Sequence, residues 1–316
     1  MKCKRCRKTA AVALPSHHAA FCPECFLVFF ERQVAAAIKT FQMCSRDDRI
    51  LVAVSGGKDS LALAWQLQRL NLNVSALHLD LGIADSSTVA RAHTESMCRQ
   101  FGIDLHVVEF ADLKMAIPDV KARIKRPICS VCGRLKRHVF NRYALENGFD
   151  VLATGHNLDD ETARLLSNTL RWDTDYLAGQ SPSLPGDPGF ARKIKPLCQL
   201  TEYETAALCF LAGLNYGHQP CPYSPGATFT RYKILLNNLE DDQPGRKRSF
   251  YSQYLRQARP VFERLREDRS TPAIAPCQGC GSPTTAGLCS VCRIREAMDL
   301  EPLTIIPSSK SKTPCP

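Results

Sequence analysis

A nine-residue stretch from Val52 to Ser60, VAVSGGKDS, constrains this chain more than any other feature. An apolar run, Ile50 to Val54, leads into a Ser-Gly-Gly turn, and a helical pattern, Leu61 to Leu70, follows. A strand that ends in a glycine-rich turn and opens a helix is suited to phosphate, because the backbone can approach an anion and the free N–H groups of the helix point at it. Lys58 adds a positive charge. The stretch predicts a phosphate site; the alternative is an ordinary turn with a surface lysine.

The stretch is not a Walker A loop. That motif has a glycine five positions before its second glycine, and Ser or Thr directly after the lysine. Here Val52 occupies the first of these positions and Asp59 follows Lys58. A different class of nucleotide-binding turn is therefore indicated.

Strands and helices alternate through the central part of the chain. Apolar and amphipathic patterns predict strands at 50–54, 74–79, 105–110, 151–154 and 192–199, and helices at 31–43, 61–70, 86–101, 135–147, 159–169 and 202–214, with an irregular segment at 173–190. This alternation predicts an α/β fold with a doubly wound parallel sheet. Ligands of such sheets bind beyond the carboxyl ends of the strands. We therefore expect the ends of the second and fourth strands to lie beside the glycine-rich turn: His78, Leu79 and Asp80, and Gly155, His156 and Asn157.

Cysteine is the second constraint, because ten of the sixteen cysteines form five C-x-x-C pairs. No run reaches the ~20 apolar residues of a membrane span, and the start lacks an apolar secretory core. We expect a cytoplasmic protein, whose thiols stay reduced and available to metals. Two pairs at each end have the spacing of a zinc ribbon: Cys3, Cys6, Cys22 and Cys25, and Cys277, Cys280, Cys289 and Cys292. Four thiolates close the shell of Zn²⁺, so both sites are predicted to be structural.

The fifth pair, Cys129 and Cys132, lies in a stretch from Lys121 to Arg142 with eight Lys or Arg and no acid. No second pair lies nearby, and Cys221 is the best third ligand; Cys198 and Cys209 are further candidates. Three thiolates would leave one position free, which suits a [4Fe–4S] cluster with one open iron or a dithiol with a reactive third cysteine. The alternatives are a zinc site completed by a histidine, or a redox pair.

The chain is basic, with 41 Lys and Arg against 31 Asp and Glu. A surplus of this kind favours a polyanionic partner such as RNA. The segment from Arg246 to Glu267 is basic and helical in pattern, and it carries Phe250, Tyr251 and Tyr254. Rings and cations together suit single-stranded RNA; the alternative is a solvated helix whose aromatic rings pack inward.

The stretch from Thr154 to Glu161, TGHNLDDE, is a second candidate for phosphate chemistry. Asp159, Asp160 and Glu161 could hold Mg²⁺ against the phosphates. The alternative is the acidic first turn of a helix, which suits the positive end of the helix dipole.

These motifs occur in the order of one family: a four-cysteine ribbon, SGGKDS, C-S-x-C-G, TGHNLDDE, a late Cys-Pro and a second four-cysteine ribbon. Over about residues 1–295 the chain resembles the TtuA-type tRNA 2-thiouridine synthetases, in the TtcA/TtuA group of PP-loop ATP pyrophosphatases. The resemblance implies an adenine-nucleotide alpha-hydrolase-like PP-loop domain between two zinc ribbons. The boundaries we expect are 1–33 for the first ribbon, 34–245 for the catalytic domain, 246–272 for a basic helical segment, 273–300 for the second ribbon and 301–316 for a disordered tail.

The resemblance also implies roles for particular residues. ATP with Mg²⁺ would be bound by Ala53, Ser55, Gly56, Gly57, Lys58, Asp59, Ser60, His78, Leu79, Gly155 and Asp160. A [4Fe–4S] cluster would be held by Cys129, Cys132 and Cys221. Catalytic roles would fall to Lys58, Asp59, Lys136, Asp160, Cys132 and Cys221.

The implied activity is ATP-dependent tRNA 2-thiolation. The C2 oxygen of a uridine is adenylated and then replaced by sulfur, delivered through the cluster or through a persulfide on Cys132 or Cys221. The uridine is either in the T-loop or at the wobble position. The donor is a ubiquitin-like carrier thiocarboxylate or free sulfide, and the family precedent is a homodimer. The alternatives are another PP-loop tRNA modification (2-thiocytidine formation or lysidine-type amination) and a non-catalytic zinc-ribbon RNA-binding protein, which would not need an intact SGGKDS.

Overall fold

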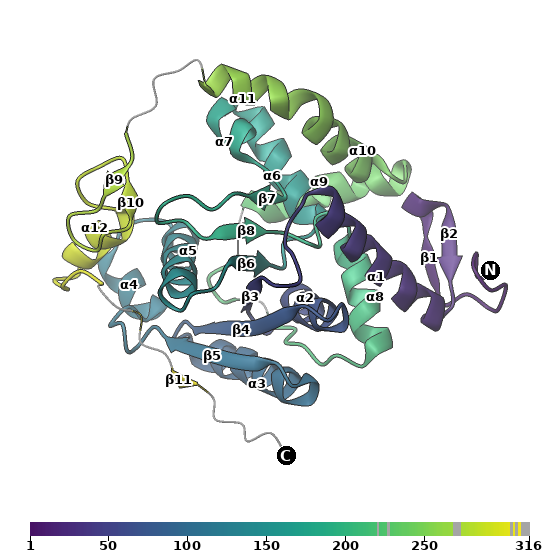
Figure 1. Cartoon of the computed structure of the whole chain (residues 1–316), viewed down its shortest axis with the longest axis horizontal. Helices are drawn as coiled ribbons and strands as arrows, with labels where there is room; N and C mark the ends of the chain where they lie inside the picture. Colours follow the sequence, from purple (N-terminus) through teal and green to yellow (C-terminus); the bar gives the residue numbers. More distant parts are fainter. Residues whose placement is uncertain (220, 226–227, 268–272, 304–305, 307–308, 311–316) are drawn as a thin grey trace.

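A seven-stranded sheet forms the centre of the molecule, in the order β11-β5-β4-β3-β6-β8-β7 (Figure 1). The computed structural model describes residues 1–316 except 220, 226–227, 268–272, 304–305, 307–308 and 311–316. The parallel strands are β3 (Arg49–Val54), β4 (Asn73–Asp80), β5 (Asp104–Glu109), β6 (Val151–Thr154) and β8 (Arg192–Ile194). The two-residue edge strands β7 (Ser183–Leu184) and β11 (Ser309–Lys310) are antiparallel. The predicted doubly wound sheet is confirmed, and its direction of winding reverses between β3 and β6.

Strand β3 is buried on both faces, as expected for the middle of a parallel sheet. Ile50, Val52 and Val54 belong to one hydrophobic core, and Leu51 belongs to a second one, because successive side chains of a strand point to opposite faces. The first core is closed by α1 (Pro23–Thr40), α2 (Lys58–Arg69), α3 (Ala84–Phe101) and α8 (Glu202–Ala212). The second is closed by α4 (Ile117–Arg123), α5 (Ile128–Glu146) and the C-terminal cysteine-rich segment.

The remaining helices gather around α6 (Leu158–Leu170), which contacts α7 (Thr174–Gly179), α9 (Thr228–Asp242) and α10 (Arg246–Gln253). A π-helical turn (Tyr254–Ala258) continues α10 into α11 (Arg259–Glu267), as the helical pattern predicts. Tyr251 and Tyr254 are buried, 2% and 5% exposed. The idea that these two rings stack on RNA bases is therefore wrong, and the inward-packing alternative is confirmed for them.

Several elements differ from the sequence predictions. Helix α5 begins at Ile128, well before the predicted residue 135, because Pro127 at its N-cap position opens the helix through the polar C-S-V-C-G stretch. Helix α1 begins at Pro23, where proline suits a first helical turn. The segment 173–190 is not wholly irregular: Asp173 caps α7, and β7 follows. Strand β8 ends at Ile194, two residues before Pro196, which cannot donate to a sheet ladder.

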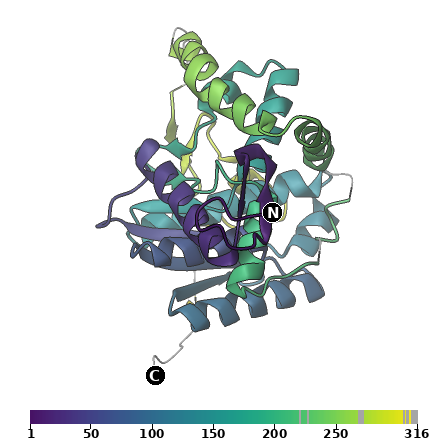
Figure 2. The ribbon, with the colours of Figure 1, turned by 90° about the vertical axis from the view of Figure 1, so that its right-hand side faces the viewer.

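Two small cysteine-rich units lie at opposite ends of the long axis (Figure 1). The N-terminal knuckle contains β1 (Val12–Leu14) and β2 (Ala19–Phe21) and passes directly into α1. The C-terminal knuckle contains β9 (Ala275–Pro276), β10 (Pro283–Thr284) and α12 (Ser290–Glu296). Seen along the long axis, the N-terminal knuckle faces the viewer and the C-terminal knuckle lies behind (Figure 2).

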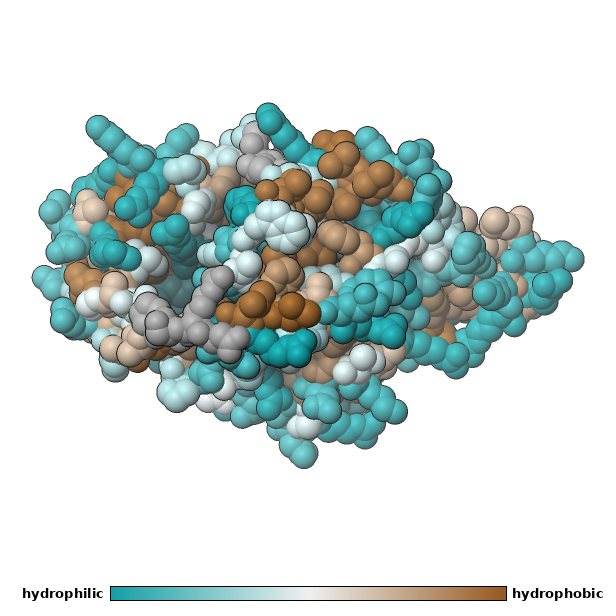
Figure 3. All heavy atoms as spheres, turned by 90° about the horizontal axis from the view of Figure 1, so that it is seen from above, coloured by the Kyte–Doolittle hydropathy of each residue, from teal (hydrophilic) through white to brown (hydrophobic). Residues whose placement is uncertain are grey.

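Part of the predicted disordered tail is ordered in the structure. Leu303 and Ile306 are buried, and Ser309–Lys310 pairs with β5; residues 311–316 lie outside the described residues. The face seen from above carries apolar patches within a mostly polar surface (Figure 3). Among the described residues, no helix combines the length and apolarity needed to cross a membrane.

Candidate active site

The glycine-rich turn between β3 and α2 can be built only with glycine at its closest contacts. Gly56 has φ +74°, and a Cβ added there would lie 2.5 Å from the carbonyl oxygen of Ala90. A Cβ on Gly155, at the end of β6, would lie 2.9 Å from the backbone nitrogen of Ser60. The turn is therefore pressed against α3 on one side and against β6 on the other, which fixes its path.

Hydrogen bonds within the turn leave the start of α2 open. The N–H of Ser55 donates to Ser60 Oγ at 3.0 Å, and that hydroxyl is 3.0 Å from the carbonyl oxygen of Gly57. Gly57 is the N-cap of α2, and no side chain caps it. The first N–H groups of α2 are thus available to an anion, at the positive end of the helix dipole.

Asp59 is held by residues from three parts of the chain. Its Oδ1 accepts from Asn157 Nδ2 at 3.0 Å and from Thr205 Oγ1 at 2.6 Å, and its Oδ2 lies 2.9 Å from Lys58 Nζ. Burial lowers the pKa of Lys58, but the Asp59 carboxylate outweighs burial and raises the pKa above its ordinary value. Lys58 is therefore a fixed positive charge at the mouth of the turn.

The three acids of the second motif have different surroundings. Asp159 is 4% exposed and pairs with Lys247 at 2.5 Å. Glu161 is fully buried and pairs with Lys195 at 2.9 Å. Both carboxylates are enclosed within the helical layer, so the expectation that all three acids hold Mg²⁺ is wrong for these two.

Asp160 is the member of this motif that keeps an accessible carboxylate. Its side chain is 28% exposed, and Oδ1 lies 2.6 Å from Lys233 Nζ on α9. Burial raises the pKa of Asp160, but Lys233 outweighs burial and holds the pKa below its ordinary value. Lys233 also lies close enough to Lys58 to lower the pKa of that lysine. Lys58, Lys233 and the carboxylate of Asp160 therefore lie together at the entrance of the turn, beside the carboxylates of Asp59 and Glu202.

The end of β4 offers backbone groups and little side-chain surface. His78 is 2% exposed and its Nδ1 lies 3.1 Å from the carbonyl oxygen of Val54, and Leu79 is 6% exposed. Any contact of these residues with a nucleotide must therefore come from the main chain. Ala53, one residue before Val54, lies in β3 opposite Thr154 of β6, directly below the turn.

The central cysteines come together from two segments. Cys129 and Cys132 lie in the first turns of α5, and Cys129 Sγ is 3.1 Å from the carbonyl oxygen of Tyr223, two residues after Cys221. Burial raises the pKa of Cys132, Lys136 lowers it, and the thiols of Cys221 and Cys129 raise it further. Lys136 follows Cys132 by one helical turn and so shares its face of α5.

These three sulfurs do not form a tight group. In the part of the chain that the structure describes, they do not come within 4.8 Å of one another, the separation that both four-cysteine groups meet. Ligands of one metal ion must crowd together, whereas each cysteine of a [4Fe–4S] cluster binds a different iron. As they lie here, the three sulfurs are therefore too far apart to bind one zinc ion together.

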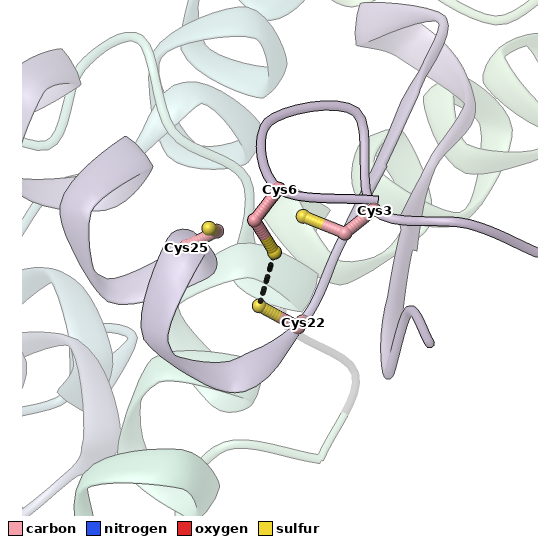
Figure 4. A group of neighbouring side chains, drawn as sticks. All are labelled: Cys3, Cys6, Cys22 and Cys25. Atoms are coloured by element: carbon pink, nitrogen blue, oxygen red, sulfur yellow. Dashed lines mark hydrogen bonds between the residues drawn. The ribbon is translucent and has the colours of Figure 1, made fainter. Parts of the chain in front are cut away.

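The four-cysteine groups at the two ends fit zinc. In each group the four sulfurs lie within 4.8 Å of one another. Figure 4 shows the N-terminal group, Cys3, Cys6, Cys22 and Cys25. Four sulfurs at ~2.3 Å around a tetrahedral Zn²⁺ would be ~3.8 Å apart, and the Cys6–Cys22 and Cys280–Cys289 sulfurs are 3.5 and 3.7 Å apart. Four thiolates this close repel one another unless a cation lies between them.

One short segment joins the central cysteines to the glycine-rich turn between β3 and α2, which we call the phosphate turn. The N–H of Gly217 donates to the carbonyl oxygen of Gly56 at 2.9 Å, and Cys221 follows four residues later. Four residues span at most about 14 Å. The strand–turn–helix at the switch point of the sheet, with this second site tethered to it, defines a PP-loop enzyme. Residues 28–216 match the PP-loop domain family, and residues 2–27 match the N-terminal LIM domain of the 2-thiouridine synthetase TtuA.

The chain belongs to the TtuA-type tRNA 2-thiouridine synthetases. It is 40% identical to the tRNA-5-methyluridine(54) 2-sulfurtransferase of Pyrococcus horikoshii, over 93% of each chain. It is 39% identical to the protein of the same name from Thermus thermophilus, over 94% of this chain and 92% of that one. The structure of the U34-tRNA thiolase NcsA from Methanococcus maripaludis with its [4Fe-4S] cluster matches 99% of both chains, with a TM-score of 0.78 and 29% identity.

Sequence reasoning missed Thr205 and Lys233, and it expected Asn157 beside the turn without its contact with Asp59. Asn157 and Thr205 hold Asp59, and Lys233 pairs with Asp160. Thr205 lies in an apolar helical pattern and Lys233 in a helix that the sequence patterns did not predict, so neither carried a local signal. Asn157 stood within the second motif as a residue beside the turn, but its contact with Asp59 spans 98 positions.

Proposed function

We propose that this protein is an ATP-dependent tRNA 2-sulfurtransferase that replaces the C2 oxygen of uridine 54 with sulfur. The observation that carries the proposal is the tether between the phosphate turn and the cysteines. The Gly217 N–H donates to the Gly56 carbonyl oxygen at 2.9 Å, and Cys221 follows Gly217 by four residues. A site that activates an oxygen and a site that supplies sulfur must both reach one base. A tether of four residues, which spans at most about 14 Å, supports the proposal that both sites act on the same base.

Activation is needed because the C2 oxygen of uridine is a poor leaving group. The oxygen attacks the α-phosphorus of ATP, pyrophosphate leaves, and the adenylated oxygen can later depart as AMP. Negative charge shifts to the β-phosphate as the bond to pyrophosphate breaks. The open N–H groups of α2 and the ammonium of Lys58 are placed to stabilise that charge.

Asp59 positions Lys58. Its Oδ1 is committed to Asn157 and Thr205, so only Oδ2 faces the lysine. This arrangement restricts the lysine to the mouth of the turn and reduces the conformational entropy that it loses when ATP binds.

Asp160 is the carboxylate that would hold Mg²⁺ together with the phosphates, since oxygen ligands suit this ion. Bound there, Mg²⁺ would supply positive charge to the transferring phosphate. Lys233 pairs with Asp160 at 2.6 Å and with Glu202 at 2.5 Å. We expect Lys233 to remain with Glu202 when Asp160 takes a metal, and so to serve as a second cation beside the phosphates.

Cys129, Cys132 and Cys221 would hold the [4Fe–4S] cluster. With three protein ligands, such a cluster would leave one iron without a cysteine ligand and would supply iron–sulfur chemistry beside the base. Lys136, one turn beyond Cys132, places a cation beside this sulfur site, where it can stabilise the negative charge of the departing AMP.

Position 54 is favoured over position 34 by the relatives. The two relatives at 40% and 39% identity are named for 5-methyluridine 54, while the wobble-uridine thiolase is 29% identical.

The sulfur donor is a carrier thiocarboxylate or free sulfide, and reconstitution of the reaction with each donor distinguishes the two.

Nucleoside mass spectrometry of tRNA tests the proposal. A deletion strain should lose 2-thiolated 5-methyluridine and keep the wobble 2-thiouridine, and the wild-type gene should restore it. A Lys58→Ala gene should not restore it, because the phosphate site would lack its cation. Persistence of the position-54 nucleoside in the deletion strain would overturn the proposal, and loss of only the wobble nucleoside would overturn the position.

A further inference from the structure

A cavity of about 370 Å³ lies between α5, the segment around β8 and the C-terminal knuckle. In this region α12 packs against α5 (Figure 1). Three segments that are far apart in the sequence contribute cations to the wall: Arg134 and Arg137 from α5, Lys193 from β8 and Arg293 from α12. Among the residues that the structure describes, no Asp or Glu lines the cavity.

The cations of this cavity act on one another. Burial and the positive charges of Arg164 and Arg134 lower the pKa of Arg137. Burial and Arg137 lower the pKa of Lys193. Positive groups that are partly removed from water and have no carboxylate among them repel one another. Such an arrangement is stabilised when an anion binds between them.

The donors of the cavity suit phosphate in particular. Guanidinium groups bind phosphate oxygens through paired hydrogen bonds, and Lys adds a point charge. Ser290, also in the wall, can contribute a neutral donor. Phosphodiester groups of RNA present two such oxygens at every nucleotide.

The cavity lies on the helix that carries the sulfur site. Arg137 follows Cys132 by five residues, which is ~7.5 Å along the helix axis and about 140° around it. A phosphate held by Arg137 therefore lies on a different face of α5 from Cys132, about one helix width away.

We propose that this cavity binds a backbone phosphate of the tRNA and so sets which nucleotide reaches the cysteines. This inference rests on the proposed function, because it takes tRNA as the substrate. The C-terminal knuckle then has a direct role, since zinc-dependent folding of the knuckle places Arg293 in the wall.

The test is the salt dependence of tRNA binding to the full-length protein. The test variant is Lys193→Gln with Arg293→Gln, and its matched control is Lys39→Gln with Arg99→Gln, which removes the same charge from two exposed residues on α1 and α3. Fluorescence anisotropy with an unmodified tRNA transcript gives the slope of log K against log salt. Each lost phosphate contact should reduce that slope by about 0.7 to 0.9, so we expect a reduced slope in the test variant and the wild-type slope in the control.

Two further arms separate the outcomes. The double variant Lys193→Arg with Arg293→Lys keeps both positive charges and should keep the wild-type slope. A reduced slope in this variant would mean that the substitutions act through structure and would overturn the inference. Inorganic phosphate should compete with tRNA for the wild type more strongly than its ionic strength explains, because it can occupy the same cations, and this excess should be absent in the test variant. Competition of equal strength in the wild type and the test variant would overturn the inference.

The same protein preparations are assayed for tRNA 2-thiolation and for ATP affinity. If the wild type thiolates tRNA while test and control variants have equal slopes, the phosphate site is wrong and the proposed function stands. If the slopes differ as expected but the wild type forms no 2-thiouridine, the RNA site stands and the proposed function fails. ATP affinity should be equal in all variants.

Discussion

At the scale of single residues, Asp59 depends on partners that lie far away in the sequence. Thr205 Oγ1 donates to Asp59 Oδ1 at 2.6 Å, and Asn157 donates to the same oxygen at 3.0 Å. If Asp59 loses one of these donors, its carboxylate can rotate, and Lys58 moves with it. Thr205 is thus a positioning residue for the phosphate site.

We expect Thr205→Val to reduce the rate of tRNA-dependent pyrophosphate release. A hydrogen bond to a charged group contributes about 1.5–3 kcal/mol, which corresponds to a roughly 10- to 100-fold effect. Thr205→Ser should restore the rate, because it restores the hydroxyl. The matched control is Thr169→Val, whose hydroxyl bonds only within α6, to the Leu165 carbonyl. Equal rates for the wild type and Thr205→Val would contradict the positioning role.

Gly155 gives a second prediction at this scale. An added Cβ would lie 2.9 Å from the backbone of both Asp59 and Ser60, and backbone atoms cannot yield as a flexible side chain can. Gly155→Ala should therefore displace the turn and abolish ATP binding in calorimetry, while circular dichroism stays unchanged. Gly179→Ala is the control, because its nearest neighbour would be a side-chain nitrogen of Arg266 at 3.7 Å. Unchanged ATP affinity in Gly155→Ala would refute this steric argument.

At the scale of elements, α6 is anchored to the rest of the fold by buried ion pairs. Glu161, in its first turn, pairs with Lys195 at 2.9 Å and accepts from Tyr251 OH at 3.0 Å. Burial raises the pKa of Glu161, but Lys195 outweighs it, so the folded-state pKa lies below the ordinary value. A carboxyl group with a depressed folded-state pKa stabilises the fold above its unfolded-state pKa, and this contribution is lost as the pH falls through the folded-state pKa.

Lys195→Met should therefore destabilise the protein most near neutral pH. Removing one partner of a buried pair costs about 3–5 kcal/mol, because the other charge is left unpaired. The cost should shrink in acid, where Glu161 of the variant is protonated and no longer a buried charge. Urea unfolding of both proteins at pH 7.5 and at acid pH measures the difference. A difference that is constant across this range would show that packing, and not charge, accounts for the loss.

The elements also show how far sequence patterns reach. The apolar run of β3 and the double glycine after it are local signals, so the sheet and the phosphate turn were predictable. The start of α5 was not predictable from the sequence, because the polar stretch around Cys129 and Cys132 has no apolar periodicity. Helix α9 was missed as well, and with it Lys233. The pairing of Asp159 and Glu161 with lysines on other elements depends on tertiary packing, which a local acidic motif cannot show.

At the scale of the whole molecule, the sulfur site exists only when the chain is folded. Cys129 and Cys132 lie on α5, and Cys221 lies 89 residues after Cys132 in a segment that the Gly217–Gly56 hydrogen bond ties to the phosphate turn. Folding of the sheet therefore brings the third cysteine to the other two. The proposed cluster site and the phosphate turn share this one segment, so we expect a change in one to alter the other.

Anaerobic purification followed by iron, sulfide and zinc analysis tests whether Cys129, Cys132 and Cys221 hold an iron–sulfur cluster. The wild type should carry about four irons, as expected of a [4Fe–4S] cluster. Cys221→Ser should lose iron and sulfide but keep both zinc ions, because the four-cysteine groups at the two ends do not involve Cys221. Cys198→Ser is the control: Cys198 is fully buried in the core around α1 and α8, and its loss should leave the iron content unchanged. A wild type with zinc and no iron would instead favour a PP-loop reaction without sulfur transfer, and iron retained in Cys221→Ser would remove this cysteine from the site.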